Sequence, residues 1–210
     1  TELAERSFFG TSRLYNENTP LSKRNHFTIY NALPPGFSIV RENRSFVRPI
    51  TIGVVSRLEE IKGMDLVVPA FAQVKKRYPD TRLVIVGEGS LRVKMQRQVQ
   101  ECDCTDNVEW AGRQPQERLM EWYRRMDIVL MPSRSEGFGL TAIEAMANGC
   151  VVVASRTGGL PEVVQDGEVG LLHEVGSIDD MANKIISLIA TPELLQKYSS
   201  EAIRYVRRYS

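Results

Sequence analysis

From Ile50 onward the sequence alternates between short apolar runs and longer segments in which apolar residues recur at helical spacing. The apolar runs hold few polar positions, so they lack the in-and-out alternation of a strand with one solvent-exposed face. Uninterrupted apolar strands that alternate with amphipathic helices are typical of a parallel sheet covered by helices on both faces. The pattern therefore predicts a doubly wound α/β fold.

The predicted strands and helices alternate as far as the fifth strand, which is followed directly by the sixth strand and then by the last two helices. The expected strands are Ile50–Ser56, Arg82–Val86, Asn107–Trp110, Asp127–Met131, Val151–Ser155 and Val169–Leu172. The expected helices are Met64–Tyr78, Leu91–Glu101, Pro115–Met126, Thr141–Asn148, Ile178–Ala190 and Glu193–Tyr209. Pro79 cannot continue the first helix, and Gly149 is a typical residue to end the fourth.

The N-terminal part of the chain does not follow this pattern. It is polar and rich in turn residues, and only Phe27–Tyr30 resembles a strand. The sequence Asn-Ala-Leu-Pro-Pro-Gly that comes next is typical of a stiff linker. We therefore predict that residues 1–35 are the remnant of a neighbouring domain with its linker, and that residues 36–210 form the main domain with its C-terminal helices. The chain starts without methionine and ends without a helix-stop signal, so we expect it to be a fragment of a longer protein.

Charge and cysteine content exclude several classes of function. Lys and Arg number 27 against 26 Asp and Glu, which leaves no basic excess of the kind that duplex-binding proteins need, so we expect no nucleic-acid partner. The longest apolar runs are far too short to cross a bilayer, and the start does not resemble a signal peptide. Cys102, Cys104 and Cys150 lack a paired metal-ligand spacing, so we expect reduced thiols, with Cys150 in the core, and no metal site.

Polar residues and glycines follow most of the predicted strands. They are Arg57 and Lys62 after the first strand, Glu88 after the second, Arg113 after the third, Glu136 after the fourth and Thr157 to Gly159 after the fifth. In doubly wound sheets, ligands bind beyond the carboxyl ends of the strands, near the point where the strand order reverses. The sequence therefore predicts a ligand site at that edge of the sheet.

The residue types at this edge suit a sugar joined to a diphosphate. Cations such as Arg57 and Lys62, and free amides at a helix start, suit the anionic diphosphate. Carboxylates such as Glu136 and Glu144 suit hydroxyl groups. Each carboxylate also has a structural interpretation, because Glu144 could be a solvated helix residue and Glu136 a charge that favours the helix dipole.

Several motifs in this region occur in a fixed order. They are Ser-Arg-Leu with Lys-Gly at 56–63, Val-Gly-Glu-Gly at 86–89, Pro-Ser with Glu-Gly-Phe-Gly and Glu-Ala at 132–145, Thr-Gly-Gly-Leu-Pro-Glu at 157–162, and Asp-Gly-Glu-Val-Gly-Leu-Leu at 166–172. In this order they resemble the C-terminal, donor-binding half of a retaining glycosyltransferase of the GT-B fold, in the large group 1 (family 4) of these enzymes. Ser56 stands where the family has a glycine, and Ala32 stands where it has the glycine of an Asn-Gly hinge.

The resemblance implies roles for individual residues. Arg57 and Lys62 would hold the diphosphate of a donor nucleotide sugar and neutralise the charge of the departing nucleoside diphosphate. Glu136, the third residue expected to act in catalysis, would accept hydrogen bonds from the donor sugar. Glu144 would accept both ribose hydroxyls. The other implied donor contacts are Gly87, Arg113 near the base, and the amides of Phe138, Gly139, Leu140 and Thr141.

The resemblance also implies partners and a setting. The donor would be a nucleotide diphosphate sugar, with UDP favoured, and the acceptor a glycan or lipid-linked glycan used in cell-surface polysaccharide or glycolipid synthesis. Residues 1–35 would then belong to the N-terminal acceptor domain, whose remainder would complete the active site and make any membrane contact. We expect no cofactor or metal, and a cytoplasmic location or a peripheral one at the inner face of the membrane. Two alternatives remain open: a fragment that binds nucleotide sugar without turnover, and a sugar-nucleotide epimerase-like domain.

Overall fold

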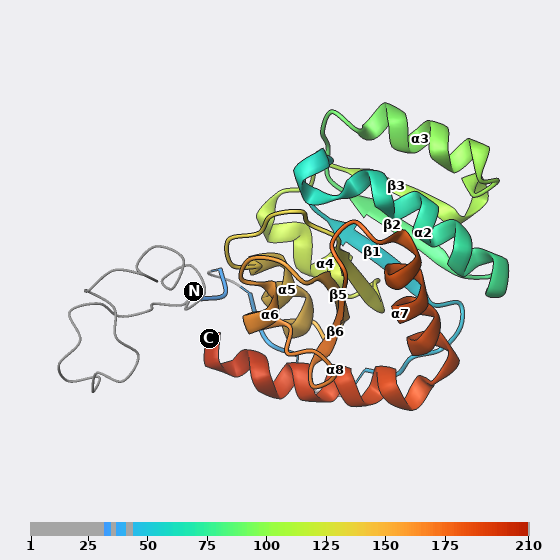
Figure 1. Cartoon of the computed structure of the whole chain (residues 1–210). Coiled ribbons are helices and arrows are strands. Elements are labelled where there is room, and N and C mark those ends of the chain that lie inside the picture. Colours follow the sequence, from blue (N-terminus) through green and yellow to red (C-terminus); the bar gives the residue numbers. More distant parts are fainter. Residues whose placement is uncertain (1–31, 35–36, 41–43, 210) are drawn as a thin grey trace, which may run out of the picture.

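The computed structural model describes residues 32–34, 37–40 and 44–209 of the chain. Six strands form one all-parallel sheet in the order β3-β2-β1-β4-β5-β6 (Figure 1). The strands are β1 (Thr51–Val55), β2 (Arg82–Val86), β3 (Val108–Gly112), β4 (Ile128–Met131), β5 (Val151–Ser155) and β6 (Gly170–His173). The predicted doubly wound α/β fold is confirmed.

Helices cover both faces of the sheet. The α-helices are α2 (Met64–Arg77), α3 (Arg92–Glu101), α4 (Leu119–Tyr123), α5 (Leu140–Ala147), α6 (Leu160–Val163), α7 (Ile178–Ala190) and α8 (Pro192–Val206). Single 3₁₀ turns are η2 (Glu60–Lys62), η3 (Thr105–Asn107), η4 (Gln116–Arg118) and η5 (Arg207–Tyr209). The side chains of α2, α3 and α7 join one apolar cluster, and those of α4, α5 and α6 join the other. Helix α8 contributes to both, with Leu195 and Tyr198 in the first cluster and Ala202 and Val206 in the second.

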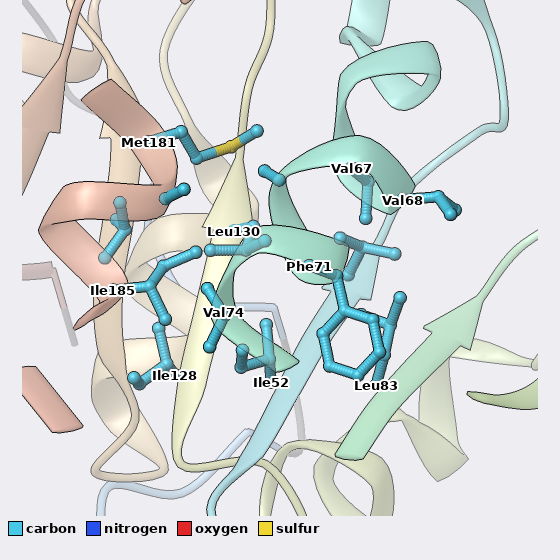
Figure 2. Close-up of a cluster of buried hydrophobic side chains, with 14 of the residues drawn as sticks. Ile52, Val67, Val68, Phe71, Val74, Leu83, Ile128, Leu130, Met181 and Ile185 are labelled. Carbon is cyan, nitrogen blue, oxygen red and sulfur yellow. The ribbon is translucent and has the colours of Figure 1, made fainter. Parts of the chain in front are cut away.

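Alternate residues of each strand point to opposite clusters. In β2, Leu83 and Ile85 pack with the α2 side, whereas Val84 and Val86 pack with the α5 side. Figure 2 shows the first cluster, where Phe71 of α2 lies beside Leu83 of β2, and Ile185 of α7 lies near Ile128 of β4. Burial on both faces explains why the strands carry continuous apolar runs rather than an alternating pattern.

Two predicted helices differ from the structure. The segment predicted as one helix, Pro115–Met126, contains only the turn η4 and the short helix α4. After Tyr123 the chain tightens into a turn, in which the Arg125 and Met126 amides donate to the carbonyls of Trp122 and Tyr123, and the Asp127 amide then donates to the Thr51 carbonyl of β1. The Arg44 guanidinium donates to the carbonyl oxygens of Tyr123 at 3.3 Å and Arg124 at 2.9 Å, which the end of the helix leaves available. The helix predicted to reach Tyr209 ends at Val206 and tightens into η5. The short helix α6 was not predicted, because one turn carries too little periodicity to detect.

The segment before β1 packs against the end of the chain and against α5. The Leu33 amide donates to the Tyr209 carbonyl at 2.8 Å, and the Val40 amide donates to the Ala147 carbonyl at 2.9 Å. The strand predicted at Phe27–Tyr30 lies outside the described residues. The domain boundary predicted after residue 35 also lies outside the described residues and stays a prediction.

The three cysteines are free thiols, and Cys104 and Cys150 are buried. Burial raises the pKa of the Cys150 thiol to about 12, so this side chain behaves as a small apolar core residue, as expected. Across the part of the chain that the structure describes, no helix combines the length and apolar character that a membrane span requires.

Replacing Phe71 with alanine tests the importance of the first cluster. Phe71 is fully buried, so we expect Phe71→Ala to lower the free energy of unfolding by about 3–5 kcal/mol, measured by urea denaturation. Val93 is 69% exposed, and Val93→Ala should change stability by no more than about 0.5 kcal/mol. Equal losses in the two variants would contradict this account of the core.

Candidate functional site

The strand order reverses between β1 and β4, which lie side by side at the centre of the sheet. The chain leaves β1 toward α2 on one face and leaves β4 toward α5 on the other, so a crevice opens between the two loops. A pocket of about 210 Å³ lies there. Its polar and helix-start residues are Ser56, Arg57, Lys62, Ser133, Glu136, Leu140 and Thr141. The structure thus brings together five of the predicted site residues, from sequence segments far apart in the chain.

An ion pair lies inside this pocket. Lys62 Nζ lies 2.8 Å from Glu136 Oε2, and the two side chains are 22% and 16% exposed. The Ser133 hydroxyl donates to the same carboxylate oxygen at 3.3 Å. Arg57, by contrast, is exposed at the mouth of the pocket. Lys62 is thus held by a carboxylate, whereas Arg57 forms no ion pair with any carboxylate among the described residues.

Two glycines allow the loops of the pocket to approach so closely. Gly63 has a φ of 66°, and a Cβ atom there would lie 1.9 Å from the Pro132 carbonyl oxygen. Gly158 has a φ of 53°, and a Cβ there would lie 1.7 Å from the Glu136 carbonyl oxygen. No residue with a side chain could occupy either position without moving the backbone. Glycine at these positions thus fixes Lys62 and Glu136 at opposite sides of one pocket.

A second ion pair joins the same loops outside the pocket. The Arg134 guanidinium donates to both carboxylate oxygens of Asp65, at 2.7 and 2.9 Å, and the Arg134 amide donates to the Ile61 carbonyl at 2.9 Å. These hydrogen bonds hold the pKa of Asp65 below its ordinary value. Sequence reasoning missed this pair, because no local pattern relates residues 69 positions apart. It anchors the start of α2 to the loop that carries Glu136.

Glu144 lies one turn inside α5 and is only 4% exposed. Tyr123 Oη donates to Oε2 at 2.8 Å, and Gln116 Nε2 donates to Oε1 at 3.0 Å. Burial raises the pKa of the Glu144 carboxyl, and the two hydrogen bonds partly oppose that rise. The interpretation of Glu144 as a solvated helix residue is therefore wrong. Its two partners were not predicted, although they occur in one segment that the sequence marked as helical.

The other predicted residues lie around the pocket rather than in its wall. Gly139, with a φ of 99°, precedes the first residue of α5, and the amides of Leu140 and Thr141 belong to the first helical turn. The Phe138 ring packs edge-on against Tyr209, with centroids 5.8 Å apart. Phe138, Gly139 and Glu144 are absent from the pocket lining.

Gly87 and Arg113 lie further along the same edge of the sheet. The Gly87 amide, after β2, donates to the Gly112 carbonyl at 2.8 Å, and Gly87 has a φ of 140°. Arg113 is exposed after the edge strand β3, two strands away from β1. Neither residue lines the pocket. Among residues 32–34, 37–40 and 44–209, no group of three or more His, Cys, Asp or Glu side chains could hold a metal ion.

The fold and the pocket define a doubly wound parallel α/β domain with a polar pocket at its switch point. The family model of the glycosyl transferases group 1 matches residues 38–205, so the chain belongs to this family of enzymes. A D-inositol 3-phosphate glycosyltransferase from Segniliparus rotundus is 36% identical over 163 residues, which cover 76% of this chain and 36% of that protein. A GDP-mannose-dependent alpha-(1-6)-phosphatidylinositol monomannoside mannosyltransferase from Mycolicibacterium smegmatis is 34% identical over 152 residues, or 69% of this chain and 40% of that protein. The chain thus spans well under half the length of these relatives.

Solved structures show the same architecture. The C-terminal domain of LpcC, a glycosyl transferase group 1 family protein from Francisella tularensis, superposes with a TM-score of 0.74 at 28% identity, covering 82% of this chain and 95% of that one. HepE from Anabaena, solved in complex with UDP, gives a TM-score of 0.69 at 26% identity and covers 76% of this chain and 44% of its own. The six-stranded sheet and its helices are therefore the Rossmann-like arrangement of GT-B glycosyltransferase domains.

Replacing Tyr123 with phenylalanine tests the environment of Glu144. The Tyr123 hydroxyl donates to the ionised carboxylate and so lowers its pKa, which means that Tyr123→Phe should raise the pKa of Glu144 further. Carbon-13 NMR of the carboxyl groups as a function of pH measures this directly. Tyr78→Phe is the control, because that ring stacks on Arg48 at 4.5 Å. An unchanged or lower pKa in Tyr123→Phe would show that the hydrogen bond does not stabilise the carboxylate.

Proposed function

We propose that this chain is the donor-binding half of a retaining GT-B glycosyltransferase, which binds a nucleotide diphosphate sugar for transfer to a glycan or lipid-linked acceptor. The observation that carries the proposal is the pocket at the switch point, where two cations, one carboxylate and the start of α5 converge. Family membership supports the reaction class. The pocket supports the donor class, because a nucleotide sugar needs phosphate and hydroxyl recognition within a few ångströms.

Phosphate recognition falls to Arg57, Lys62 and the first turn of α5. Both cations line the pocket, and the amides of Leu140 and Thr141 lie at a helix N-terminus, where backbone N–H groups favour anions. As the sugar departs, negative charge accumulates on the leaving nucleoside diphosphate. Pre-positioned cations and amides would stabilise that charge more in the transition state than in the ground state.

Hydroxyl recognition falls to the two carboxylates. Glu136 lines the pocket beside Lys62, in position for the hydroxyls of the donor sugar. Glu144 uses one acceptor site on each oxygen for Tyr123 and Gln116. A carboxylate offers about four acceptor sites, so one site on each oxygen remains for the two ribose hydroxyls.

Recognition of the base falls to residues beside the pocket. Arg113, Gly87, Phe138 and Leu140 lie beyond the carboxyl ends of the strands or at the start of α5. We propose UDP as the nucleotide because HepE was solved with it and superposes on this chain. The M. smegmatis relative is GDP-mannose-dependent, so the guanine nucleotide is the competing outcome of the test.

Acceptor recognition falls to an N-terminal half of the same protein, so we propose that this chain alone binds donor without steady transfer. The relatives are more than twice as long as the region that this chain matches, which supports that division of labour. The proposed setting is the cytoplasm or the inner face of the membrane, with any membrane contact and the polysaccharide or glycolipid acceptor reached through the N-terminal half. We propose no metal or protein nucleophile in this half.

A thermal-shift panel with UDP, GDP, ADP and their glucose or mannose conjugates tests the proposal. A ligand at 100 times its Kd should stabilise the chain by about 2.7 kcal/mol, a shift of roughly 5–10 °C. Lys62→Ala should weaken nucleotide binding by about 10- to 100-fold, because it removes a charge-assisted hydrogen bond to phosphate.

Lys76→Ala is the matched control for this panel, since Lys76 is an exposed lysine near the far end of α2. It should leave nucleotide binding unchanged. The absence of a thermal shift with every nucleotide, or an equal loss of nucleotide binding in both lysine variants, would contradict the proposed donor site.

A further inference from the structure

The ion pair between Lys62 and Glu136 is built into the pocket rather than formed by chance between two surface side chains. Both side chains are largely buried, and the 2.8 Å contact is joined by the Ser133 hydroxyl at 3.3 Å. The backbone on each side is held by a glycine in close contact: Gly63 lies against Pro132, and Gly158 lies against the Glu136 carbonyl. A ligand group that binds Lys62 must therefore share or draw away an ammonium group that a carboxylate already holds.

A phosphate group meets two costs at this position. It competes with Glu136 for the single ammonium group of Lys62, and its own negative charge lies near the Glu136 carboxylate. Like charges at short range repel strongly where water is partly excluded. A free nucleoside diphosphate carries additional charge, because its terminal phosphate has a second ionisation near pH 6 that a sugar-linked phosphate lacks. The cost is therefore larger for the free nucleoside diphosphate.

A sugar on the diphosphate removes part of this cost. An ionised carboxylate only accepts hydrogen bonds, and sugar hydroxyls can donate them. When Lys62 turns to the phosphate, hydroxyl donors from the sugar can replace it at Glu136. Free nucleoside diphosphate lacks the transferred sugar, and its ribose hydroxyls are assigned to Glu144, so it leaves Glu136 with the Ser133 hydroxyl as its protein donor in the pocket.

We propose that Glu136 is a specificity-determining residue that makes the site prefer a sugar-loaded nucleoside diphosphate over the free one, by competing with phosphate for Lys62. The inference rests on the proposed function. It means that the same carboxylate that binds the sugar favours release of the nucleoside diphosphate once the sugar has gone. Glu136 thus acts on the balance between donor and product as well as on donor recognition.

Isothermal titration of the chain with UDP and UDP-glucose, and in parallel with GDP and GDP-mannose, tests this inference. Glu136→Gln keeps the size of the side chain and removes its charge. We expect it to tighten binding of the free nucleoside diphosphate by about threefold or more, and not to tighten the sugar conjugate. Glu136→Ala, which cannot donate a hydrogen bond to phosphate, should tighten the free diphosphate as well.

Two further variants keep the test specific. Glu109→Gln removes a carboxylate from an exposed ion pair with Arg125, near the start of β3 and so toward the opposite edge of the sheet, and should not change either Kd. In a Lys62→Ala background only the direct repulsion between Glu136 and phosphate remains, so Glu136→Gln should have a smaller effect on the free diphosphate. An undiminished effect there would overturn the competition for Lys62.

The failures of the two proposals can be told apart. If the unaltered chain binds nucleotides but the Glu136 variants bind the free diphosphate no more tightly, this inference is wrong. The proposed donor site is then unaffected. If the unaltered chain binds none of the four nucleotides, both the proposed function and this inference are wrong.

Discussion

Burial of both faces of a parallel sheet is the constraint on which the rest of this structure depends. Because every strand runs in the same direction, every loop that follows a strand arrives at the same edge of the sheet. The order β3-β2-β1-β4-β5-β6 then sends the chain to opposite faces after β1 and after β4. A crevice between these two loops follows from the topology alone, before any side chain is considered.

Close backbone contact turns that crevice into a specific site. Gly63 and Gly158 allow loops from β1, β4 and β5 to touch at distances that a Cβ atom would forbid. The ion pair of Arg134 with Asp65 then locks the start of α2 to the loop before α5. The side chains that line the pocket are thereby held in place by residues outside it, which is the usual requirement for a pre-organised binding site.

Glu136, which opens the Glu-Gly-Phe-Gly segment, and Glu144, in the helix α5 that follows it, occupy different electrostatic environments. Glu136 faces a cation, whereas Glu144 is buried between the neutral donors Tyr123 and Gln116. Desolvation raises the pKa of Glu144. Glu136 is thus paired with a positive charge that would also attract a phosphate, whereas Glu144 is oriented as a hydrogen-bond acceptor. Identical side chains eight positions apart can therefore serve different chemistry.

The sequence by itself determined the fold class, the strands to within about two residues and the edge at which Arg57, Lys62 and Glu136 gather, because apolar periodicity and glycine placement are local properties. It could not reveal that the helix predicted over Pro115–Met126 ends at Tyr123, since the chain then turns to pair the Asp127 amide with the Thr51 carbonyl of β1, a partner far away in the sequence. Nor could it show that Lys62 is already paired with Glu136, 74 positions away. Tertiary structure decided these features because they depend on which distant groups become neighbours in space, and chain topology alone sets that.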